Sequence, residues 1–262
     1  PQGGLFGPTT APSSSAYSGL PTGMGVRSIG APGFSQSCEI YRTTDTTPPI
    51  GTPSSPQDEG ATTGRPRLSF TWTVGTAADA DSGIAAYNLK VGTTAGGSDL
   101  FLGTVGSVLT HTVSGATDGK TYYAAVQAIN GAGLTGNWSS ASDGIRVALP
   151  TLATALDTTG LSWATSGSGS WYGQTETTHD GVDAAQSPEL DDSQNSYVQA
   201  TVVGPGTLTF YYKVSSEEGY DFLSFSLDGS RQFEVSGKVD WQQRTVAISS
   251  GNHVIRWTYA KD

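Results

Sequence analysis

The sequence predicts an all-β protein made of two β-sandwich domains in series, preceded by an arm rich in glycine, proline and serine. Apolar and polar residues alternate over much of the chain, most continuously from Tyr197 to Tyr259, which is typical of half-buried strands. The 35 glycines, the 13 prolines and the low share of charged residues, 14%, disfavour a helical protein. No stretch of comparable length has the periodicity of a helix.

The charge balance excludes some classes of partner. The formal net charge is -10, and residues 151–262 contain fourteen Asp or Glu against six Lys or Arg, a difference of -8. We therefore expect no binding to nucleic acid or to anionic lipid.

No apolar run reaches the roughly 18 residues that a membrane helix needs, so no membrane insertion is expected. Cys38 is the single cysteine and rules out an intrachain disulfide. Because the chain begins at Pro1 and not at methionine, we expect a processed product or a fragment.

Residues 1–48 form the predicted arm. Most of this segment lacks periodicity and reads as a flexible linker, but apolar residues gather between Val26 and Tyr41. We expect an assembly arm that packs on a neighbouring chain or domain; strands left from a preceding domain are the alternative. The run from Thr46 to Pro49 ends the arm, because tandem proline continues neither a helix nor a central strand.

Residues 49–149 are predicted to form an immunoglobulin-like sandwich of about seven short strands. The run from Leu68 to Val74 alternates and places Leu68, Phe70 and Trp72 on one face. Further strands are expected at 84–91, 99–105, 108–113, 121–130 and 145–147.

These residues resemble a fibronectin type III domain. The resemblance is carried by TWTV, by DSGIAAYNLKV and by TDGKTYYAAVQAINGAG followed by NWS, and the spacing of Tyr122, Val126, Ala128 and Asn130 fits the pattern Y-x-x-x-V-x-A-x-N. The resemblance implies that Tyr122 makes a corner hydrogen bond. It says little about function, because such modules are often spacers, and the adhesive Arg-Gly-Asp tripeptide is absent from the sequence.

Residues 150–262 resemble the MAM-like, concanavalin-type jelly rolls of large bacterial secreted and surface proteins. The segments that carry the resemblance are HDGVDAAQS, GPGTLTFYYKVSSEEGYDFLSFSLDG and VSGKVDWQQRTVAISSGNHVIRWTYAKD. An extracellular or cell-surface location in bacteria is implied. Members usually continue with an acidic segment and a closing strand after a phrase such as YAKD. Three accounts remain open: the parent protein continues, the last part is disordered, or another chain supplies the strand.

The sequence contains no motif of a known catalytic site, so we expect no enzyme activity. His111, His179 and His253 lie in different predicted elements, and no second His or Cys stands at the spacing of a zinc site. There is no G-x-S-x-G elbow, phosphate loop or HExxH helix. The many Ser and Asp residues make a Ser-His-Asp triad easy to propose by chance.

Calcium is the cofactor that the acidic loops suggest, because it prefers several oxygen ligands supplied by loops. The candidate ligands are Asp180, Asp183, Asp191, Asp192 and Asp221. The alternative is that these loops are solvated and hold no ion.

Exposed aromatic residues suggest polysaccharide as a ligand. Trp171 and Tyr172 lie in a glycine-rich stretch, and Trp241 follows a predicted turn. The alternative is that these rings cap the ends of the core, since that buries much apolar area. The core itself is predicted to contain Trp163, Phe210, Tyr212, Phe225 and Trp257.

The leading hypothesis is a non-catalytic adhesion or assembly region of a bacterial secreted or cell-surface protein, with other chains or neighbouring domains as partners. One alternative is a carbohydrate-binding accessory region of a secreted hydrolase whose catalytic domain lies elsewhere. The other is a structural subunit of an extracellular layer or filament.

Overall fold

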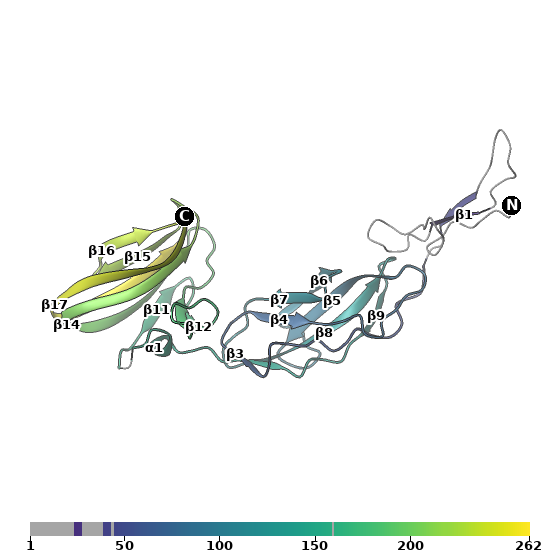
Figure 1. The fold of residues 1–262 in the computed structure, drawn as a ribbon, viewed down its shortest axis with the longest axis horizontal. Helices are drawn as coiled ribbons and strands as arrows, with labels where there is room; N and C mark the ends of the chain where they lie inside the picture. Colours follow the sequence, from purple (N-terminus) through teal and green to yellow (C-terminus); the bar gives the residue numbers. More distant parts are fainter. Residues whose placement is uncertain (1–23, 28–38, 43–44, 159) are drawn as a thin grey trace, which may run out of the picture. The chain divides into compact units, whose positions relative to one another are not determined.

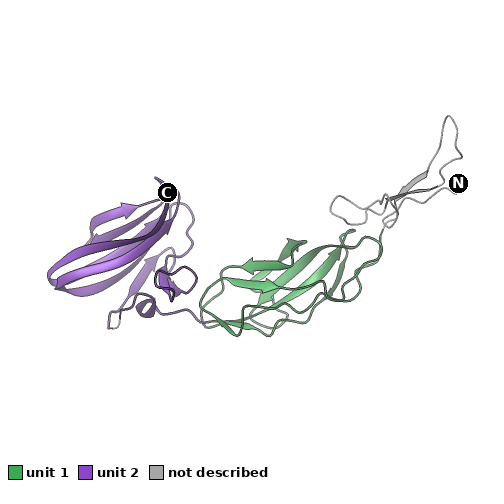
Figure 2. Ribbon diagram, viewed as in Figure 1, with its two compact units in different colours: residues 1–147 green, residues 148–262 purple. Residues whose placement is uncertain are grey.

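A computed structural model describes residues 24–27, 39–42, 45–158 and 160–262. The chain divides into two compact units, residues 1–147 and residues 148–262 (Figure 2). In the arm, β1 (Met24–Arg27) pairs antiparallel with β2 (Glu39–Arg42). The rest of the predicted arm up to residue 44, including Cys38, lies outside the described residues. The prediction of an all-β protein is confirmed, because the one described helix has four residues.

Unit 1 is a two-layered sandwich. Its strands are β3 (Thr62–Thr63), β4 (Leu68–Thr71), β5 (Ile84–Gly92), β6 (Phe101–Gly106), β7 (Thr110–Val113), β8 (Thr121–Asn130), β9 (Thr135–Trp138) and β10 (Ile145–Val147). One sheet has the order β3-β10-β8-β5-β6, with β9 also on β8, and the other pairs β4 with β7 (Figure 1). The segment before β3 bridges to β4 at Gln57 and Thr71. This arrangement agrees with the fibronectin-type-III-like sandwich predicted from the sequence.

The alternation of β4 fills the space between the two sheets of unit 1. Leu68 and Phe70 are fully buried, and Trp72 is 4% exposed, as predicted. The Trp72 ring meets the edge of Tyr87 on β5 at 5.9 Å between ring centroids. Burying such rings contributes most of the favourable free energy of a thin sandwich core.

The predicted tyrosine corner is present in unit 1. The backbone N–H of Thr117 donates a 2.9 Å hydrogen bond to the hydroxyl oxygen of Tyr122, which is itself buried. This bond fixes the loop that precedes β8, so the fibronectin type III fold of unit 1 is supported by strand order, core and corner together.

Unit 2 is a β-sandwich built around two very long strands. Its elements are α1 (Leu152–Ala155), β11 (Ala164–Gly167), β12 (Tyr172–Gln174), β13 (Ala184–Gln186), β14 (Asn195–Ser215), β15 (Phe222–Leu227), β16 (Ser230–Val235) and β17 (Lys238–Ala260). The main sheet has the order β11-β14-β17-β15-β16, and β12 pairs with β13.

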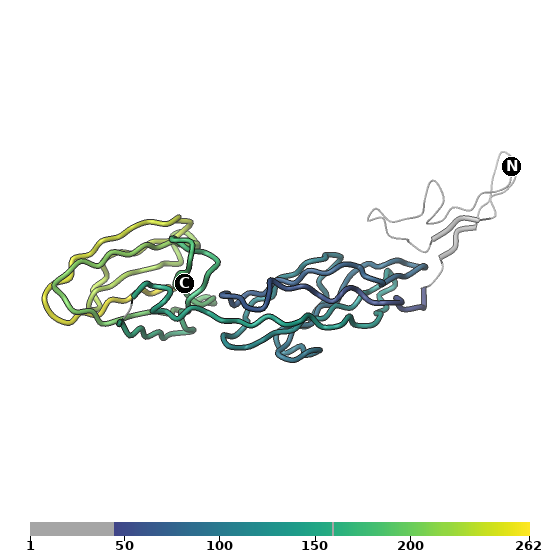
Figure 3. The backbone as a smooth tube through the Cα atoms, turned by 60° about the horizontal axis from the view of Figure 1, so that its bottom comes forward, coloured from purple at the N-terminus to yellow at the C-terminus, as the bar shows by residue number. Residues whose placement is uncertain are grey.

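The two long strands bend together and so make both layers of unit 2. Residues 195–204 pair with 251–260, and residues 206–215 pair with 238–248, with a shift in register at the bend. We call these pairs the inner halves and the outer halves. The strands curve back on themselves in Figures 1 and 3, and the ring of Phe210 in the outer half lies 5.2 Å from Phe225 and 4.9 Å from Trp257.

The core of unit 2 is buried between the inner and outer halves. Phe225 is fully buried, together with Ala200, Ile248 and Ile255. Trp163, Phe210 and Trp257, which were predicted as core, pack partly buried against this cluster, and Tyr212 is half-buried at 5.3 Å from the Phe233 ring. The assignment of unit 2 to the jelly-roll family stays a prediction.

Candidate binding face

Trp241 lies on the outward side of the outer halves of β14 and β17. Along β14 the Phe210 ring points into the core, so the next residue, Tyr211, points outward and is 46% exposed. Tyr211 pairs with Gln243 on β17, two residues after Trp241. Because side chains alternate along a strand, Trp241 and Gln243 share the face of Tyr211.

His179 adds a third ring to this face. It belongs to the loop that joins β12 to β13, and its ring stacks on Tyr211 at 3.7 Å between centroids and 18° between planes. The same ring meets Trp241 at 5.7 Å and 72°. We call these three residues the ring face. Sequence reasoning found Trp241 but missed Tyr211 and His179, because only the tertiary fold brings the loop over β14.

Polar groups border the ring face on the β-strand side. The Gln243 amide donates a 3.0 Å hydrogen bond to the Tyr211 hydroxyl. The ammonium group of Lys213 lies 2.7 Å from the Asp240 carboxylate, which also accepts the backbone N–H of Trp241. The hydrogen bond from Lys213 and then that N–H hold the pKa of Asp240 below its usual range, so this carboxylate stays charged beside Trp241.

Trp171 and Tyr172, predicted with Trp241, occupy a different setting. The Trp171 backbone N–H donates to the hydroxyl of Thr165 on β11. Its ring N–H is enclosed and has no hydrogen-bond partner among the described residues. Tyr172 is half-buried on β12, opposite Gln186. Trp171 is half-buried, and the choice between sugar binding and capping the core stays a prediction.

Two of the predicted calcium ligands face a cation of the chain itself. Lys261 lies 3.2 Å from the carboxylate of Asp192. The hydrogen bond to Asp192 and the charges of Asp192 and Asp221 raise the pKa of Lys261. Asp221 is 4% exposed. The Lys261 ammonium is therefore paired with Asp192, one of the five predicted calcium ligands.

The other three predicted ligands lie in two loops, Asp180 and Asp183 between β12 and β13 and Asp191 before β14. Asp180 accepts the backbone N–H of Val182, and Asp191 lies in the turn before β14. Burial, followed by the charges of Asp180 and Asp157, raises the pKa of Asp183. Within the described residues, no group of three or more His, Cys, Asp or Glu side chains is arranged to hold a metal ion. Calcium binding stays a prediction.

A relay of Asp228, His253 and Ser249 at the bend of unit 2 was not predicted. Nδ1 of His253 lies 2.7 Å from Asp228, and Nε2 lies 3.1 Å from the Ser249 hydroxyl. The second Asp228 oxygen accepts the backbone N–H of Val254. The relay has the connectivity of a catalytic triad, but Ser249 and His253 lie on β17 and Asp228 in the β15–β16 turn, and neither of the two described pockets is lined by these residues. We interpret it as a clamp between the β15–β16 turn and β17.

The clamp makes the stability of unit 2 depend on pH. The hydrogen bond to Asp228 raises the pKa of His253. The stability that protonated His253 contributes is therefore present at low pH and is lost as pH rises through the folded-state pKa. The hydrogen bond with His253 is the main cause that lowers the pKa of Asp228. The stability that ionised Asp228 contributes is therefore lost only in acid. We expect His253→Gln to lower the melting temperature more at about pH 5.5 than at about pH 8.5. An equal loss at both pH values in calorimetry would contradict the clamp.

In unit 1, the end of β8 gathers an acidic network that sequence reasoning also missed. The buried Asn130 amide nitrogen lies 2.6 Å from Asp45, 3.0 Å from Asp79 and 2.9 Å from the carbonyl oxygen of Thr47. Ser82 donates its hydroxyl to Asp45, and this bond is the main cause that lowers the Asp45 pKa. The network joins residues 45–47 to the end of β8.

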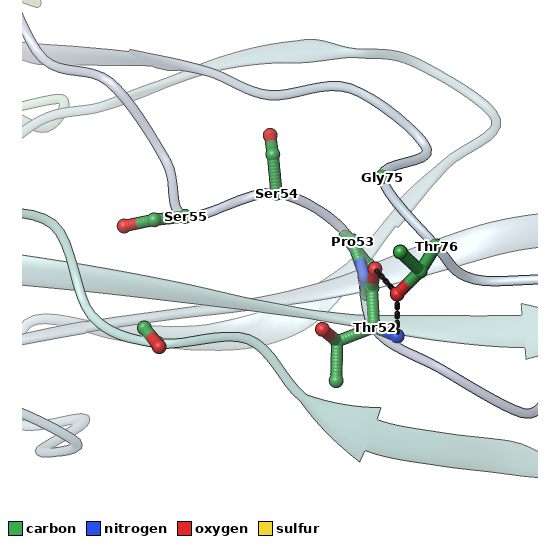
Figure 4. Close-up of a pocket in the computed structure, with 7 residues that line it drawn as sticks. Thr52, Pro53, Ser54, Ser55, Gly75 and Thr76 are labelled. Carbon is green, nitrogen blue, oxygen red and sulfur yellow. Dashed lines mark hydrogen bonds between the residues drawn. The ribbon is translucent and has the colours of Figure 1, made fainter.

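The pockets of the described residues contain little reactive chemistry. The first, in unit 1, is lined by Thr52, Pro53, Ser54, Ser55, Gly75, Thr76 and Ser140. Figure 4 shows the Thr76 hydroxyl bonded to both backbone groups of Thr52. The lining contains hydroxyl and backbone groups but no acid, base or aromatic ring. The second, in unit 2, includes Glu218 and Lys238.

Comparisons with known proteins find distant structural likenesses and no family. No family model and no curated protein matches the chain. An α-L-rhamnosidase from Dictyoglumus thermophilum is 12% identical, with a TM-score of 0.33, covering 81% of this chain and 25% of its own. The secreted serine protease VesC from Vibrio cholerae is 15% identical, with a TM-score of 0.30, covering 79% and 46%. This chain therefore spans less than half of either protein.

A fibronectin-type-III-like protein from Clostridium thermocellum is 21% identical over 38% of this chain and 93% of its own, with a TM-score of 0.27. At such TM-scores the likenesses carry no argument about function. Among the described residues, no helix has the length and apolar character needed to cross a membrane.

Proposed function

We propose that the chain is a non-catalytic adhesion region of a bacterial secreted or cell-surface protein, and that it holds polysaccharide on the ring face of unit 2. The observation that best supports the proposal is the convergence of Tyr211, Trp241 and His179 on one outward side. Binding sites typically combine apolar rings with a few placed polar groups. Here the rings of Tyr211 and Trp241 suit the apolar faces of pyranose sugars, and Gln243 and the Lys213–Asp240 pair suit their hydroxyl groups.

The charge of the chain narrows the ligand class. With a formal net charge of -10, the protein repels polyanions at long range. Neutral polysaccharides are therefore the expected ligands, and acidic ones the disfavoured class. The same ring face would serve either an adhesin or the accessory region of a secreted hydrolase, which differ only in what the parent protein contains outside this chain.

Replacing Trp241 by alanine is expected to weaken polysaccharide binding about thirtyfold, since truncating a central aromatic anchor costs roughly 2 kcal/mol. The measurement is co-sedimentation with insoluble cellulose, chitin and xylan, followed by calorimetry with their hexasaccharides. Tyr220→Ala is the matched control, because Tyr220 is 57% exposed in the turn before β15 and outside the ring face. Equal affinities for the two variants would refute the proposal.

Assembly is the second candidate function, and the edges of the outer halves favour it. In the described part of the chain, residues 206–215 and 238–248 pair with each other and with no third strand. Such edges accept strands from other chains. Oligomers that grow with concentration in sedimentation velocity, without added sugar, would favour assembly as a structural subunit over polysaccharide binding.

A further inference from the structure

The His179 ring covers the face of Tyr211 that a sugar would need. The two rings are nearly parallel and 3.7 Å apart, which is the van der Waals contact distance of stacked rings. A second ring therefore has no room on that side of Tyr211 while His179 is in place. His179 also lies against Trp241, so one imidazole shields both aromatic residues of the β-strands.

The loop that carries His179 is held at its base by buried hydrogen bonds, whereas its tip, among the described residues, has one internal hydrogen bond and the ring contacts of His179. The base is held by Gln174, which is 2% exposed and whose side chain bonds to the backbone of Glu176 and Thr177. The tip is a small turn closed by the bond from the backbone N–H of Val182 to Asp180. Residues 179–182 are exposed. The tip can therefore lift while the paired strands β12 and β13 stay in place.

We propose that the β12–β13 loop is a strap whose His179 ring occupies a hexopyranose subsite on Tyr211, and that a neutral polysaccharide binds by displacing this ring. The inference rests on the proposed function, and it adds how the same site is regulated. In the closed strap, His179 covers the apolar rings of Tyr211 and Trp241 until a sugar chain displaces it.

Because sugar binds only molecules with the strap open, the apparent affinity equals the intrinsic affinity multiplied by the open fraction. An aromatic stack of this kind corresponds to a factor of about three to ten in that equilibrium. Removing the imidazole should recover this factor. Replacing it with a larger ring should increase the competition, because indole stacks over a larger area than imidazole.

The test is isothermal titration calorimetry of the full chain with cellohexaose, chitohexaose and xylohexaose. His179→Ala is expected to bind about threefold to tenfold more tightly than the unaltered protein, and His179→Trp more weakly. Unchanged or weaker binding by His179→Ala would overturn the strap, because His179 would then be a bystander or part of the platform. Tyr211→Ala should lose the gain that His179→Ala brings.

Proton NMR of the imidazole gives a readout that is independent of affinity. The chain has three histidines, so the His179 signals can be assigned by comparison with His179→Ala. Stacked on Tyr211, they should be shifted upfield by the ring current and move to the positions of a free imidazole when hexasaccharide is added. Signals that stay in place at saturating sugar would overturn the inference.

The titration and NMR results distinguish failure of the strap from failure of the proposed function. If binding depends on Trp241 but neither titration nor NMR responds at His179, the function stands and the strap falls. If the protein and all variants bind none of the three hexasaccharides, or if Trp241→Ala binds normally, the polysaccharide function fails and the strap fails with it.

Discussion

Replacing Gly204 by alanine is expected to destabilise unit 2 by about 3 kcal/mol or more. A β-carbon built at Gly204 would lie 1.8 Å from the carbonyl oxygen of Ser249 and 2.9 Å from the side chain of Ile248. The first neighbour is backbone, which cannot move without opening the bend between inner and outer halves. Overpacking of this kind commonly costs about 1–3 kcal/mol, and more where the backbone is involved.

The chain contains its own control for this substitution. Gly206 lies two residues further along β14, and a β-carbon there meets nothing within 4 Å. Gly206→Ala should therefore change stability by no more than about 0.5 kcal/mol. The measurement is urea unfolding followed by tryptophan fluorescence, because four of the six tryptophans belong to unit 2. Similar midpoints for the two variants would mean that the close approach at the bend is unimportant.

Replacing Asn130 by alanine is expected to lower the stability of unit 1 by about 2–4 kcal/mol. Asn130 is 2% exposed, and its amide oxygen accepts the backbone N–H groups of Ala132 and Leu134. Its amide nitrogen serves the acidic network around Asp45 and Asp79. Alanine would leave the N–H groups of Ala132 and Leu134 without their acceptor and would remove one donor from each of two carboxylates, and each such loss costs roughly 1–3 kcal/mol where the group is buried.

The control for Asn130 is Asn137, which is exposed on β9. Asn137→Ala should be nearly neutral, as surface substitutions usually are. Hydrogen exchange read separately for the two units is the suitable measurement, because a chain of two units need not unfold in one step. Faster exchange in unit 2 than in unit 1 after Asn130→Ala would contradict the role given to the network.

Much of the fold could be predicted because strands alternate with period two. Leu68, Phe70 and Trp72 were placed on one face from their spacing alone, and all three are buried. The corner bond of Tyr122 followed from a resemblance and is present. The strands of unit 1 were located well, since each is short and bounded by turn residues.

The bend of β14 and β17 could not be predicted in the same way. The sequence pattern continues through Gly204 and Gly251 as if two straight strands ran from end to end. Which layer each half joins depends on contacts such as that of Phe210 with Trp257, and these are distant in sequence. Alternation specifies which side of a strand is buried but not the layer against which it is buried.

The candidate site, like the fold, could be predicted from the sequence only in part. Composition and charge indicated a β protein with acidic surfaces, and the position of Trp241 after a predicted turn made it a candidate for sugar binding. The role of Trp241 in sugar binding stays a prediction. The sequence could not indicate that His179 stacks on Tyr211, or that Lys261 lies beside Asp192.

By itself, the sequence determined the all-β class, the two-part order of the chain and the buried side of most strands, because these depend on local periodicity and turn residues. Only the tertiary structure decided which rings meet on the outer side of unit 2 and which acidic groups are neutralised by a neighbouring lysine. Those contacts join residues tens of positions apart, and their energies come from the folded packing and not from the pattern along the chain.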